Sequence, residues 1–442
     1  MTNIINPNFE DETTGRYIVV FRDDATTAGL DFLRSSCGVN NVASAADFAN
    51  SAVDPNQVSD ADGILLPTLG TMVVSNIDSN ALNQINQNVA SNNSILSVEP
   101  ERLFYAINAQ ASPDYFHGFA DAAVYLRDKF GNPQEQVESL QSIASPFVDD
   151  ASSTWGLKAT DVISSGFTGR RIKVAVLDTG MDLAHPDFSG RAITSASFVP
   201  GETVDDLNGH GTHCIGTACG GTDQNGRRYG VASEATIFAG KVLPNFTGGP
   251  TSNIIEGIEW AIDNGCEIIS LSLGNRFPSN SRAYEVVGLR ALRQGSLIVA
   301  AAGNHRLRGN STRPFSPGTV PQPANSDSIM AVAAVDNTLQ LASFSATSGS
   351  GSGANVDIAG PGVNVYSSLP TVSSVIGRSL GGVTRYGSID GTSMATPHVA
   401  GIAALYAEAT GERGDSLWRA LTSRATRLSL PNADVGSGLV QA

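Results

Sequence analysis

Residues 391–401 read Gly-Thr-Ser-Met-Ala-Thr-Pro-His-Val-Ala-Gly. The glycine predicts a tight turn, and the apolar residues that follow predict a helix over residues 394–408. Ser393 therefore lies where the first N–H groups of a helix lack intrahelical partners and carry the positive end of the helix dipole. We expect Pro397 in the first turn, where its missing N–H costs little. Because a serine before a helix is usually an N-cap, a nucleophilic role for Ser393 needs support from elsewhere in the chain.

Two further segments carry a carboxylate and a histidine. Residues 171–177 are mostly apolar and β-branched, which is typical of a buried parallel strand, and Asp178 follows at its carboxyl end. Open α/β sheets place ligands and catalytic groups at such strand ends. His210 precedes a run of small residues, 214–221, that we expect to form a helix packed closely on the sheet. The order along the chain is Asp178, His210, Ser393.

A fourth segment supplies a hydrogen-bond donor. Residues 297–302 predict another buried strand, and Gly303 and Asn304 follow it. Acyl transfer to a serine needs a base for the hydroxyl proton, a carboxylate that orients the base, and donors for the oxyanion. The side-chain amide of Asn304 can donate a hydrogen bond to that developing negative charge.

These four segments resemble the motifs of the subtilisin-like serine peptidases (subtilases), in the same order and over residues 151–442. The resemblance implies an α/β fold with a doubly wound, mainly parallel sheet. It implies Ser393 as the nucleophile and His210 as the general base and then the general acid. Asp178 would orient His210, and Asn304 would donate to the oxyanion.

Two other kinds of site use similar residues. Aspartic peptidases carry Asp-Thr-Gly, as at residues 178–180, but they need a second such motif so that two carboxylates share a proton, and the sequence holds none. A zinc site could use His210 and His213 with the cysteines that follow, but the spacing matches no Cys-x-x-Cys or His-Glu-x-x-His pattern. Cys214, directly after Gly-His-Gly-Thr-His, instead resembles the proteinase K-like branch of the subtilases.

The first third of the chain predicts a separate small α+β domain. Its expected strands lie at residues 15–22, 70–76 and 95–106, and its expected helices at residues 27–35 and 79–91. This order resembles the ferredoxin-like inhibitory propeptide of subtilases, and residues 17–21 and 97–101 carry the match. The resemblance implies a domain that assists folding and lays its C-terminal tail in the cleft as an added strand. The alternative is an independent accessory domain.

The sequence therefore predicts four parts: a flexible tail at 1–13, the propeptide domain at 14–107, a linker at 108–152 and the peptidase domain at 153–442. We expect one helix in the linker, over residues 115–130. The propeptide-like part ends near Ile107, so we expect the first self-cleavage between Ile107 and Asn108.

The resemblance also implies a set of substrate-binding residues. Ser272, Leu273 and Gly274 would offer backbone groups to one side of an extended peptide, and Gly248 and Gly249 would line the other side. Glycines at both places let a peptide backbone approach closely.

Calcium is the one cofactor that the resemblance implies, with a structural role and no part in the chemistry. Asp223 and Asn225 lie in an oxygen-rich loop, which calcium prefers, and with Asp187 they resemble a calcium site of the family, although the loop is one residue longer. Asp357 matches a second cation position. Each of these residues could equally be a solvated loop residue.

Composition excludes several classes of function. The 442 residues include 27 Lys and Arg and 42 Asp and Glu, so the formal net charge is −15. This charge argues against nucleic-acid and anionic-membrane partners, and no apolar stretch is long enough to span a membrane. Residues 1–14 are not signal-like, so we expect a cytoplasmic protein, export by a route other than Sec, or an extracellular protein whose signal has been removed.

The sequence thus predicts a serine endopeptidase that hydrolyses peptide bonds of proteins through an acyl-enzyme. We expect a monomeric zymogen that processes itself, with protein or peptide substrates and its own propeptide as partners. The alternative is a binding protein of the same fold, held shut by its propeptide. An exopeptidase of the same chemistry would need a barrier at one end of the cleft.

Overall fold

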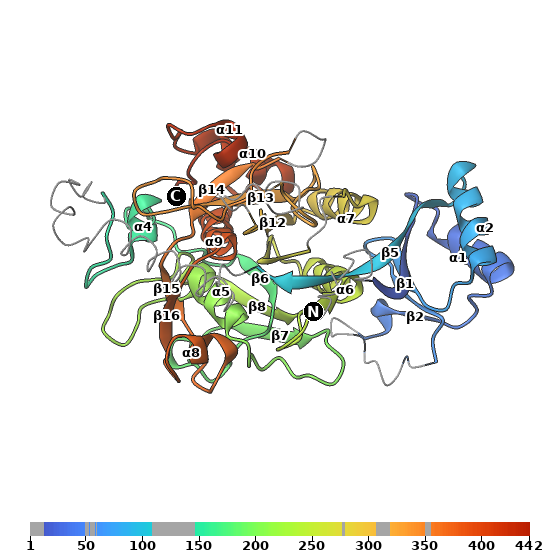
Figure 1. The fold of residues 1–442 in the computed structure, drawn as a ribbon, viewed down its shortest axis with the longest axis horizontal. Coiled ribbons are helices and arrows are strands. Elements are labelled where there is room, and N and C mark those ends of the chain that lie inside the picture. Colours follow the sequence, from blue (N-terminus) through green and yellow to red (C-terminus); the bar gives the residue numbers. More distant parts are fainter. Residues whose placement is uncertain are drawn as a thin grey trace, which may run out of the picture.

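The computed structural model describes residues 13–48, 53, 58, 60–107, 146–275, 279–305, 319–349 and 355–442. Figure 1 shows a larger body and a smaller one, connected by the long strand β5 (Ile95–Ala106). The helix predicted at 115–130 and nearly all of the predicted tail lie outside the described residues. Thr13, which we assigned to the tail, instead begins strand β1 (Thr13–Phe21).

A seven-stranded parallel sheet forms the centre of the larger body. Its strands are, in spatial order, β14 (Ile358–Pro361), β13 (Met330–Val335), β12 (Leu297–Ala301), β10 (Ile268–Leu271), β6 (Lys173–Asp178), β8 (Thr236–Lys241) and β7 (Ile193–Ser197). Every neighbouring pair is parallel. Such a sheet is buried on both faces, which explains the continuous apolar runs in the sequence.

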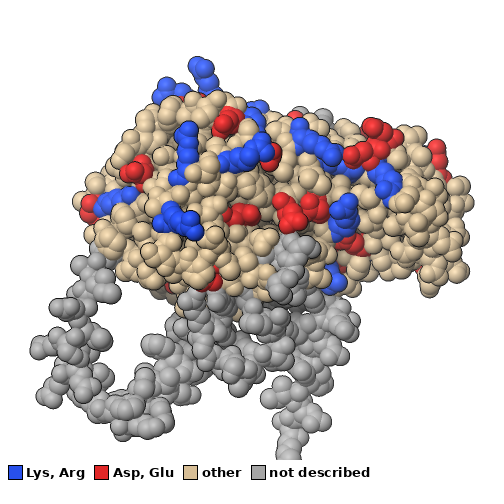
Figure 2. Space-filling view, turned by 90° about the horizontal axis from the view of Figure 1, so that it is seen from above, with Lys and Arg blue, Asp and Glu red and all other residues tan. Residues whose placement is uncertain are grey.

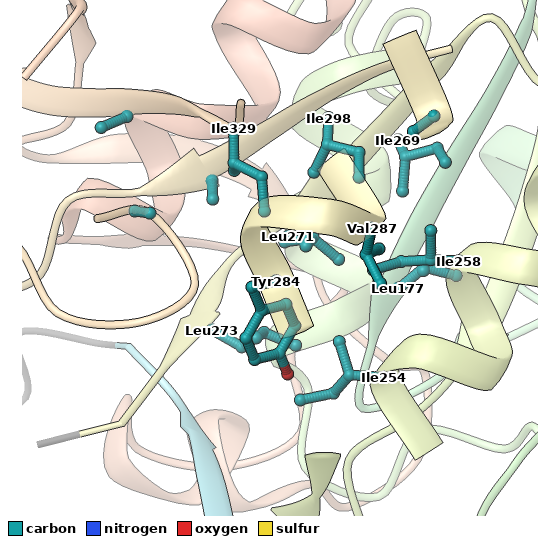
Figure 3. Packing of buried hydrophobic residues seen from close by; sticks show 14 of the residues in the cluster. Leu177, Ile254, Ile258, Ile269, Leu271, Leu273, Tyr284, Val287, Ile298 and Ile329 are labelled. Atoms are coloured by element: carbon teal, nitrogen blue, oxygen red, sulfur yellow. The ribbon is translucent and has the colours of Figure 1, made fainter. Parts of the chain in front are cut away.

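Helices cover both faces of this sheet. They include α5 (His210–Cys219) and α9 (Thr392–Thr410) on one face, and α6 (Thr251–Asp263) and α7 (Arg282–Arg293) on the other. Side chains along β6 alternate between the two cores: Val176 packs with α5 and α9, and Leu177 with α6 and α7. Figure 3 shows Leu177, Ile258 of α6 and Val287 of α7 together in the second core. The expected doubly wound α/β fold is confirmed.

Further elements complete the larger body. They are α4 (Trp155–Ala159), β9 (Gly249–Pro250), β11 (Leu273–Gly274), β15 (Val365–Ser368), α8 (Val375–Ser379), β16 (Tyr386–Ile389), α10 (Gly414–Arg424), α11 (Asn432–Val435) and the 3₁₀ turn Pro186–Phe188. None of the helices in the described part of the chain combines the length and apolarity of a membrane span. Figure 2 shows basic and acidic side chains interspersed on one face, so the net negative charge is not gathered there in a single patch.

The smaller body is a mainly antiparallel sheet with two helices. Its remaining elements are α1 (Thr26–Cys37), β2 (Val42–Ser44), the 3₁₀ turn Ala45–Phe48, β3 (Gly63–Leu66), β4 (Thr71–Val74) and α2 (Ser79–Ala90). The strand order β5-β1-β4-β3-β2 and the β-α-β-β-α-β succession of its main elements are those of a ferredoxin-like fold. Every predicted element is present within two residues of its expected bounds. The sequence analysis missed β3, which is short and is followed at once by Pro67.

Both faces of the small sheet are apolar. Val19 and Phe21 of β1 pack in the core of the smaller body, whereas Ile18 and Val20 join the core that contains α6 and α7. A strand with one solvent-exposed face would alternate apolar with polar residues. The unbroken apolar run of β1 therefore reflects a sheet that needs the larger body to cover its second face.

Candidate active site

Asp178 and His210 form a buried pair at the carboxyl end of β6. His210 Nδ1 donates to Asp178 Oδ1 at 2.7 Å, and Thr179 N donates to the same oxygen at 2.7 Å. Burial alone would lower the pKa of His210, but the charge and hydrogen bond of Asp178 outweigh it and raise the pKa well above its ordinary value. The pair is therefore built to stabilise a protonated imidazole, which is the state of a general base after it has taken a proton.

Helix α5 lies in close contact with the end of β6. A side-chain carbon on Gly211 would lie 2.2 Å from the carbonyl oxygen of Gly180. Gly211 N donates to Thr179 Oγ1 at 2.9 Å, and that hydroxyl donates to the buried Asp206 at 2.9 Å. Asp206 also accepts from Thr212 N at 2.8 Å, so one carboxylate fixes the first turn of α5 against β6. The sequence analysis gave Asp206 no such role; the available signal was an acid four residues before His210.

Ser393 lies in the first turn of α9, which begins at Thr392, two residues earlier than predicted. Its hydroxyl contacts the carbonyl oxygen of Ile107 and donates to the carbonyl oxygen of Ser272 at 3.0 Å. Nε2 of His210 is buried and has no hydrogen-bond partner among the described residues. The serine hydroxyl thus contacts the carbonyl oxygens of Ile107 and Ser272 rather than the histidine.

Pro397 lies inside α9, so our placement of it in the first turn was wrong. Without an N–H, Pro397 leaves the carbonyl of Ser393, four residues earlier, without its helical partner. Ser272 Oγ donates to that carbonyl at 2.8 Å, and Cys214 Sγ lies 3.5 Å from it. The same sulfur lies 3.8 Å from His210 Nδ1. The proline therefore frees a carbonyl that ties Ser393 to the histidine helix and to Ser272.

Asn304 faces the same carbonyl as Ser393. Asn304 Nδ2 donates to Ile107 O at 3.1 Å. Asn304 Oδ1 accepts from the N–H and the hydroxyl of Thr392, at 2.8 and 2.9 Å. Because Thr392 occupies the oxygen end of the amide, its NH₂ end must point to Ile107. The sequence analysis assigned no role to Thr392, although it stands beside Ser393 in the decisive motif.

Strand β5 lies between two short strands of the larger body. It pairs antiparallel with Leu273–Gly274 on one side and with Gly249–Pro250 on the other. Ile107 N continues this ladder by donating to Ser272 O at 3.2 Å. The residues expected to bind substrate thus hold the chain's own segment, which ends at the expected cleavage position.

Glycines allow the close approach of β5 and Ile107. A side-chain carbon on Gly248 would lie 2.7 Å from the ring of Tyr105, and one on Gly274 would lie 2.6 Å from the side chain of Ile107. Phe104 is fully buried, and its ring meets Tyr284 edge-on with centroids 5.4 Å apart. Aromatic pairs favour this arrangement.

Three tyrosines occupy the surroundings of the predicted calcium ligands. Tyr229 and Tyr386 donate from their hydroxyls to the two oxygens of Asp187, at 2.7 and 2.8 Å. Tyr366 donates to Asp223 Oδ2 at 3.0 Å and stacks on Tyr386 with ring centroids 5.6 Å apart. We call these five residues the tyrosine cluster.

A positive charge already stands beside this cluster. The Arg227 guanidinium lies 3.9 Å from the ring centroid of Tyr366, and Arg227 Nε lies 3.4 Å from Asp223 Oδ2. Asn225 contributes only its backbone N–H to Asp223, at 2.8 Å, and its side chain is exposed. Because the carboxylate oxygens already accept hydrogen bonds and a cation is present, this donor set does not fit a calcium ion.

Asp357 is also a poor cation ligand. Its Oδ2 accepts from Ala331 N at 2.8 Å, and burial raises the pKa of Asp357 to about 7. Within the described residues, the one group of three potential metal-ligand side chains is Asp178, His210 and Cys214. Burial raises the pKa of the Cys214 thiol, which disfavours the thiolate that a metal would need.

A sequence model of the subtilase family matches residues 169–436, the region that holds the Asp178–His210 pair, Asn304 and Ser393. The chain belongs to the subtilase family. It is 43% identical to Subtilisin E of Bacillus subtilis (strain 168) over 251 residues, which is 56% of this chain and 58% of that protein. It is 41% identical to Subtilisin Savinase of Lederbergia lenta over 293 residues, which is 65% of this chain and 96% of that protein. This subtilase spans only part of its longer relatives, and its place in the proteinase K-like branch stays a prediction.

We expect Gly211→Ala to push α5 away from β6, because the new carbon would meet the backbone of Gly180. Overpacking of this kind costs about 1–3 kcal/mol, so the melting temperature should fall. The downfield NMR resonance of the His210 Nδ1 proton should shift as the bond to Asp178 lengthens. Gly221→Ala is the matched control, since nothing lies within 4 Å of its new carbon. Identical spectra for the two variants would contradict this account of the site.

We expect EDTA to leave the melting temperature of the purified protein unchanged, because tyrosine hydroxyls and Arg227 already satisfy Asp187 and Asp223. Tyr386→Phe should lower it with and without calcium, since an unpaired buried carboxylate oxygen costs about 1–3 kcal/mol. Tyr406→Phe, which removes a hydroxyl outside the tyrosine cluster, is the control. Stabilisation by calcium that EDTA reverses would show that the cluster opens to a cation.

Proposed function

We propose that this subtilase is a serine endopeptidase made as a zymogen, which cuts its own chain between Ile107 and Asn108 before it acts on other proteins. One observation carries the proposal: the carbonyl oxygen of Ile107 meets both Ser393 Oγ and Asn304 Nδ2. A scissile carbonyl must meet the nucleophile and the oxyanion donor together. Membership in the subtilase family supports peptide-bond hydrolysis as the reaction.

His210 would act first as the base. Among the described residues its Nε2 is buried without a hydrogen-bond partner, and the Ser393 hydroxyl would supply one by turning toward it. Ser393 Oγ then attacks the carbonyl carbon of Ile107 while its proton passes to His210 Nε2. Asp178 stabilises the imidazolium through Nδ1, at the 2.7 Å contact that raises the pKa of His210.

Asn304 would act on the intermediate. As the new C–O bond forms, an electron pair moves onto the Ile107 oxygen, where Asn304 Nδ2 already donates. Collapse of this intermediate breaks the bond to the nitrogen of Asn108, which takes the proton held by His210. Water then attacks the acyl carbon of Ile107 while its proton passes to His210 Nε2; the bond to Ser393 Oγ breaks, Ser393 takes that proton, and Ile107 leaves as a carboxylate. The proposed reaction uses only groups of the chain and water.

The smaller body would serve as the propeptide. Its strand β5 fills the cleft with the backbone ladder that an extended substrate would use, so it blocks the cleft until it leaves. Protein and peptide substrates would replace it in the same form. The alternative is a binding protein kept shut by this strand. Such a protein would hydrolyse no substrate after the strand is removed.

Ser393→Ala should leave the chain at its full 45.9 kDa and abolish hydrolysis of casein, because no nucleophile remains. The unmodified chain should yield a fragment that begins at Asn108, as determined by N-terminal sequencing. Ser195→Ala, on the exposed side of β7, is the control and should process normally. An unmodified chain that stays intact would favour the binding protein. So would a chain that an added peptidase cuts but that still hydrolyses no substrate.

Asn304→Ala should lower kcat on a chromogenic peptide by about 10²- to 10³-fold with little change in KM, the known magnitude for an oxyanion donor of this kind. The effect belongs in kcat because the amide acts mainly on charge that develops in the transition state. Asn225→Ala, which removes an exposed amide, should change neither constant. A rise in KM at constant kcat would instead make Asn304 a ground-state binding residue.

A further inference from the structure

The ammonium group of Lys241 is buried at the carboxyl end of the central sheet, and the proposed reaction does not use it. Lys241 ends β8 and lies directly opposite Asp178, the last residue of β6, in the parallel ladder. Its side chain is fully buried. Moving a charge out of water is costly unless partners surround it, so the partners of this ammonium show what it holds in place.

The first partner is the turn that follows Asp178. The ladder reaches as far as the carbonyl oxygen of Asp178, which accepts from the two N–H groups that follow Lys241, at 2.9 and 3.1 Å. Strand β6 ends there, and the chain turns at Gly180, which has φ of +109°. The carbonyl of Thr179 therefore lies beyond the ladder, and Lys241 Nζ donates to it. The lysine side chain thus continues the hydrogen bonding where that of the backbone ends.

Two further partners belong to the loop that precedes His210. Lys241 Nζ donates to the carbonyl oxygen of Asp205 at 3.4 Å and pairs with Oε2 of Glu202 at 3.2 Å. The next residue along this loop is Asp206, which fixes the first turn of α5. The ammonium therefore contacts the segment of backbone on which the position of His210 depends.

Asn245 strengthens the connection between Lys241 and this loop. Its Oδ1 accepts from Lys241 Nζ at 2.9 Å and from Leu207 N at 2.8 Å. Its Nδ2 donates to Glu202 Oε2 at 2.7 Å, and the residue is only 5% exposed. A buried amide that uses both of its ends in this way orders the loop and the ammonium together.

We infer that Lys241 is a positioning residue for the Asp178–His210 pair. Its ammonium binds the turn after Asp178 and the loop before His210 at one point, so it fixes the two segments relative to each other. The 2.7 Å hydrogen bond between the two side chains depends on that placement, because such bonds weaken steeply with distance and misalignment. The inference rests on the proposed function, in which this pair takes the proton of Ser393.

Stability alone would not require a lysine at this position. Replacing a buried ion pair by apolar residues of similar volume is often neutral or stabilising, so an aliphatic side chain could fill the space. An aliphatic side chain cannot, however, donate to Thr179 and to the loop before His210 at the same time. Lys173 provides a contrast, because it begins β6 at the end away from the pair, where its Nζ donates to the carbonyl of Asn264 at 2.7 Å.

The test uses the full chain with Lys241→Met, which keeps an unbranched side chain of similar volume and removes the ammonium. After self-cleavage, turnover of a chromogenic peptide is measured and normalised to the number of active sites. We expect kcat to fall about 10- to 100-fold with little change in KM, because a small misplacement of catalytic groups costs this much. Lys173→Met is the matched control and should keep the kcat of the unmodified chain. An equal loss of kcat in both variants would overturn the inference, because it would trace the loss to stability.

A second measurement separates failure of this inference from failure of the proposed function. In the uncut Ser393→Ala chain, Lys241→Met should move the downfield NMR resonance of the His210 Nδ1 proton upfield as the bond to Asp178 lengthens, and Lys173→Met should not. An unmoved resonance or an unchanged kcat would overturn the role of Lys241 while leaving that of Ser393 intact. An unmodified chain that never cuts itself would overturn the proposed function, and the resonance would still test Lys241.

If Lys241→Met does not fold, Glu202→Gln weakens the same contact. The side chain of Glu202 is 29% exposed, and glutamine keeps its size and one acceptor oxygen while it removes the charge that pairs with the ammonium. We expect a smaller loss of kcat than in Lys241→Met, again with little change in KM. Glu234→Gln, which breaks the exposed pair with Arg170, is the control and should change neither constant. An unchanged kcat in Glu202→Gln would then overturn the inference.

Discussion

The arrangement of the two bodies of this subtilase depends on the contacts of one atom, the carbonyl oxygen of Ile107. Asn304 donates to it and Ser393 contacts it, while the N–H of the same residue continues the ladder of β5 onto Ser272. Each of these partners is fixed in turn: Thr392 orients the amide of Asn304, and the carbonyl freed by Pro397 ties Ser393 to Ser272. One residue of the smaller body's chain, Ile107, is thus held by the larger body through both its N–H and its carbonyl oxygen.

The order of the elements explains which parts of this site could be predicted from the sequence. Asp178, Asn304 and Ser393 follow a strand end or begin a helix, and such places are visible as an apolar run beside a polar residue. Asp206 and Thr392 act through hydrogen bonds to residues in other segments, which a local pattern does not reveal. Pro397 was misplaced because the rule for proline in helices does not anticipate a side chain that takes over the freed carbonyl. In the smaller body, β3 was missed because four residues give too short a period to recognise.

The tyrosine cluster shows why ligand sets are harder to predict than folds. Asp187 and Asp223 carry the oxygens that calcium prefers, and the sequence around them supports that prediction. Tyr229 follows the loop of Asp223, while Tyr366 and Tyr386 come from the β15–β16 ribbon far along the chain. Only the folded chain brings these hydroxyls to the carboxylates. A hydrogen-bonded aromatic cluster can therefore hold together the same two segments that a shared cation would hold. Arg227 supplies part of the positive charge that such a cation would bring.

Two kinds of contact hold the smaller body, a backbone ladder in the cleft and side-chain contacts of two helices with the turn 67–70. The β5 ladder uses backbone groups that every extended chain offers, so it does not distinguish the smaller body from other extended chains. The contacts of Glu259 and Arg290 carry that distinction, because they need a buried leucine, a positive-φ glycine and free carbonyls in one turn. They lie on helices that also form the core beneath the central sheet. The larger body therefore contacts the smaller one in two ways, through the backbone of β5 in the cleft and through the side chains of α6 and α7 at the turn 67–70.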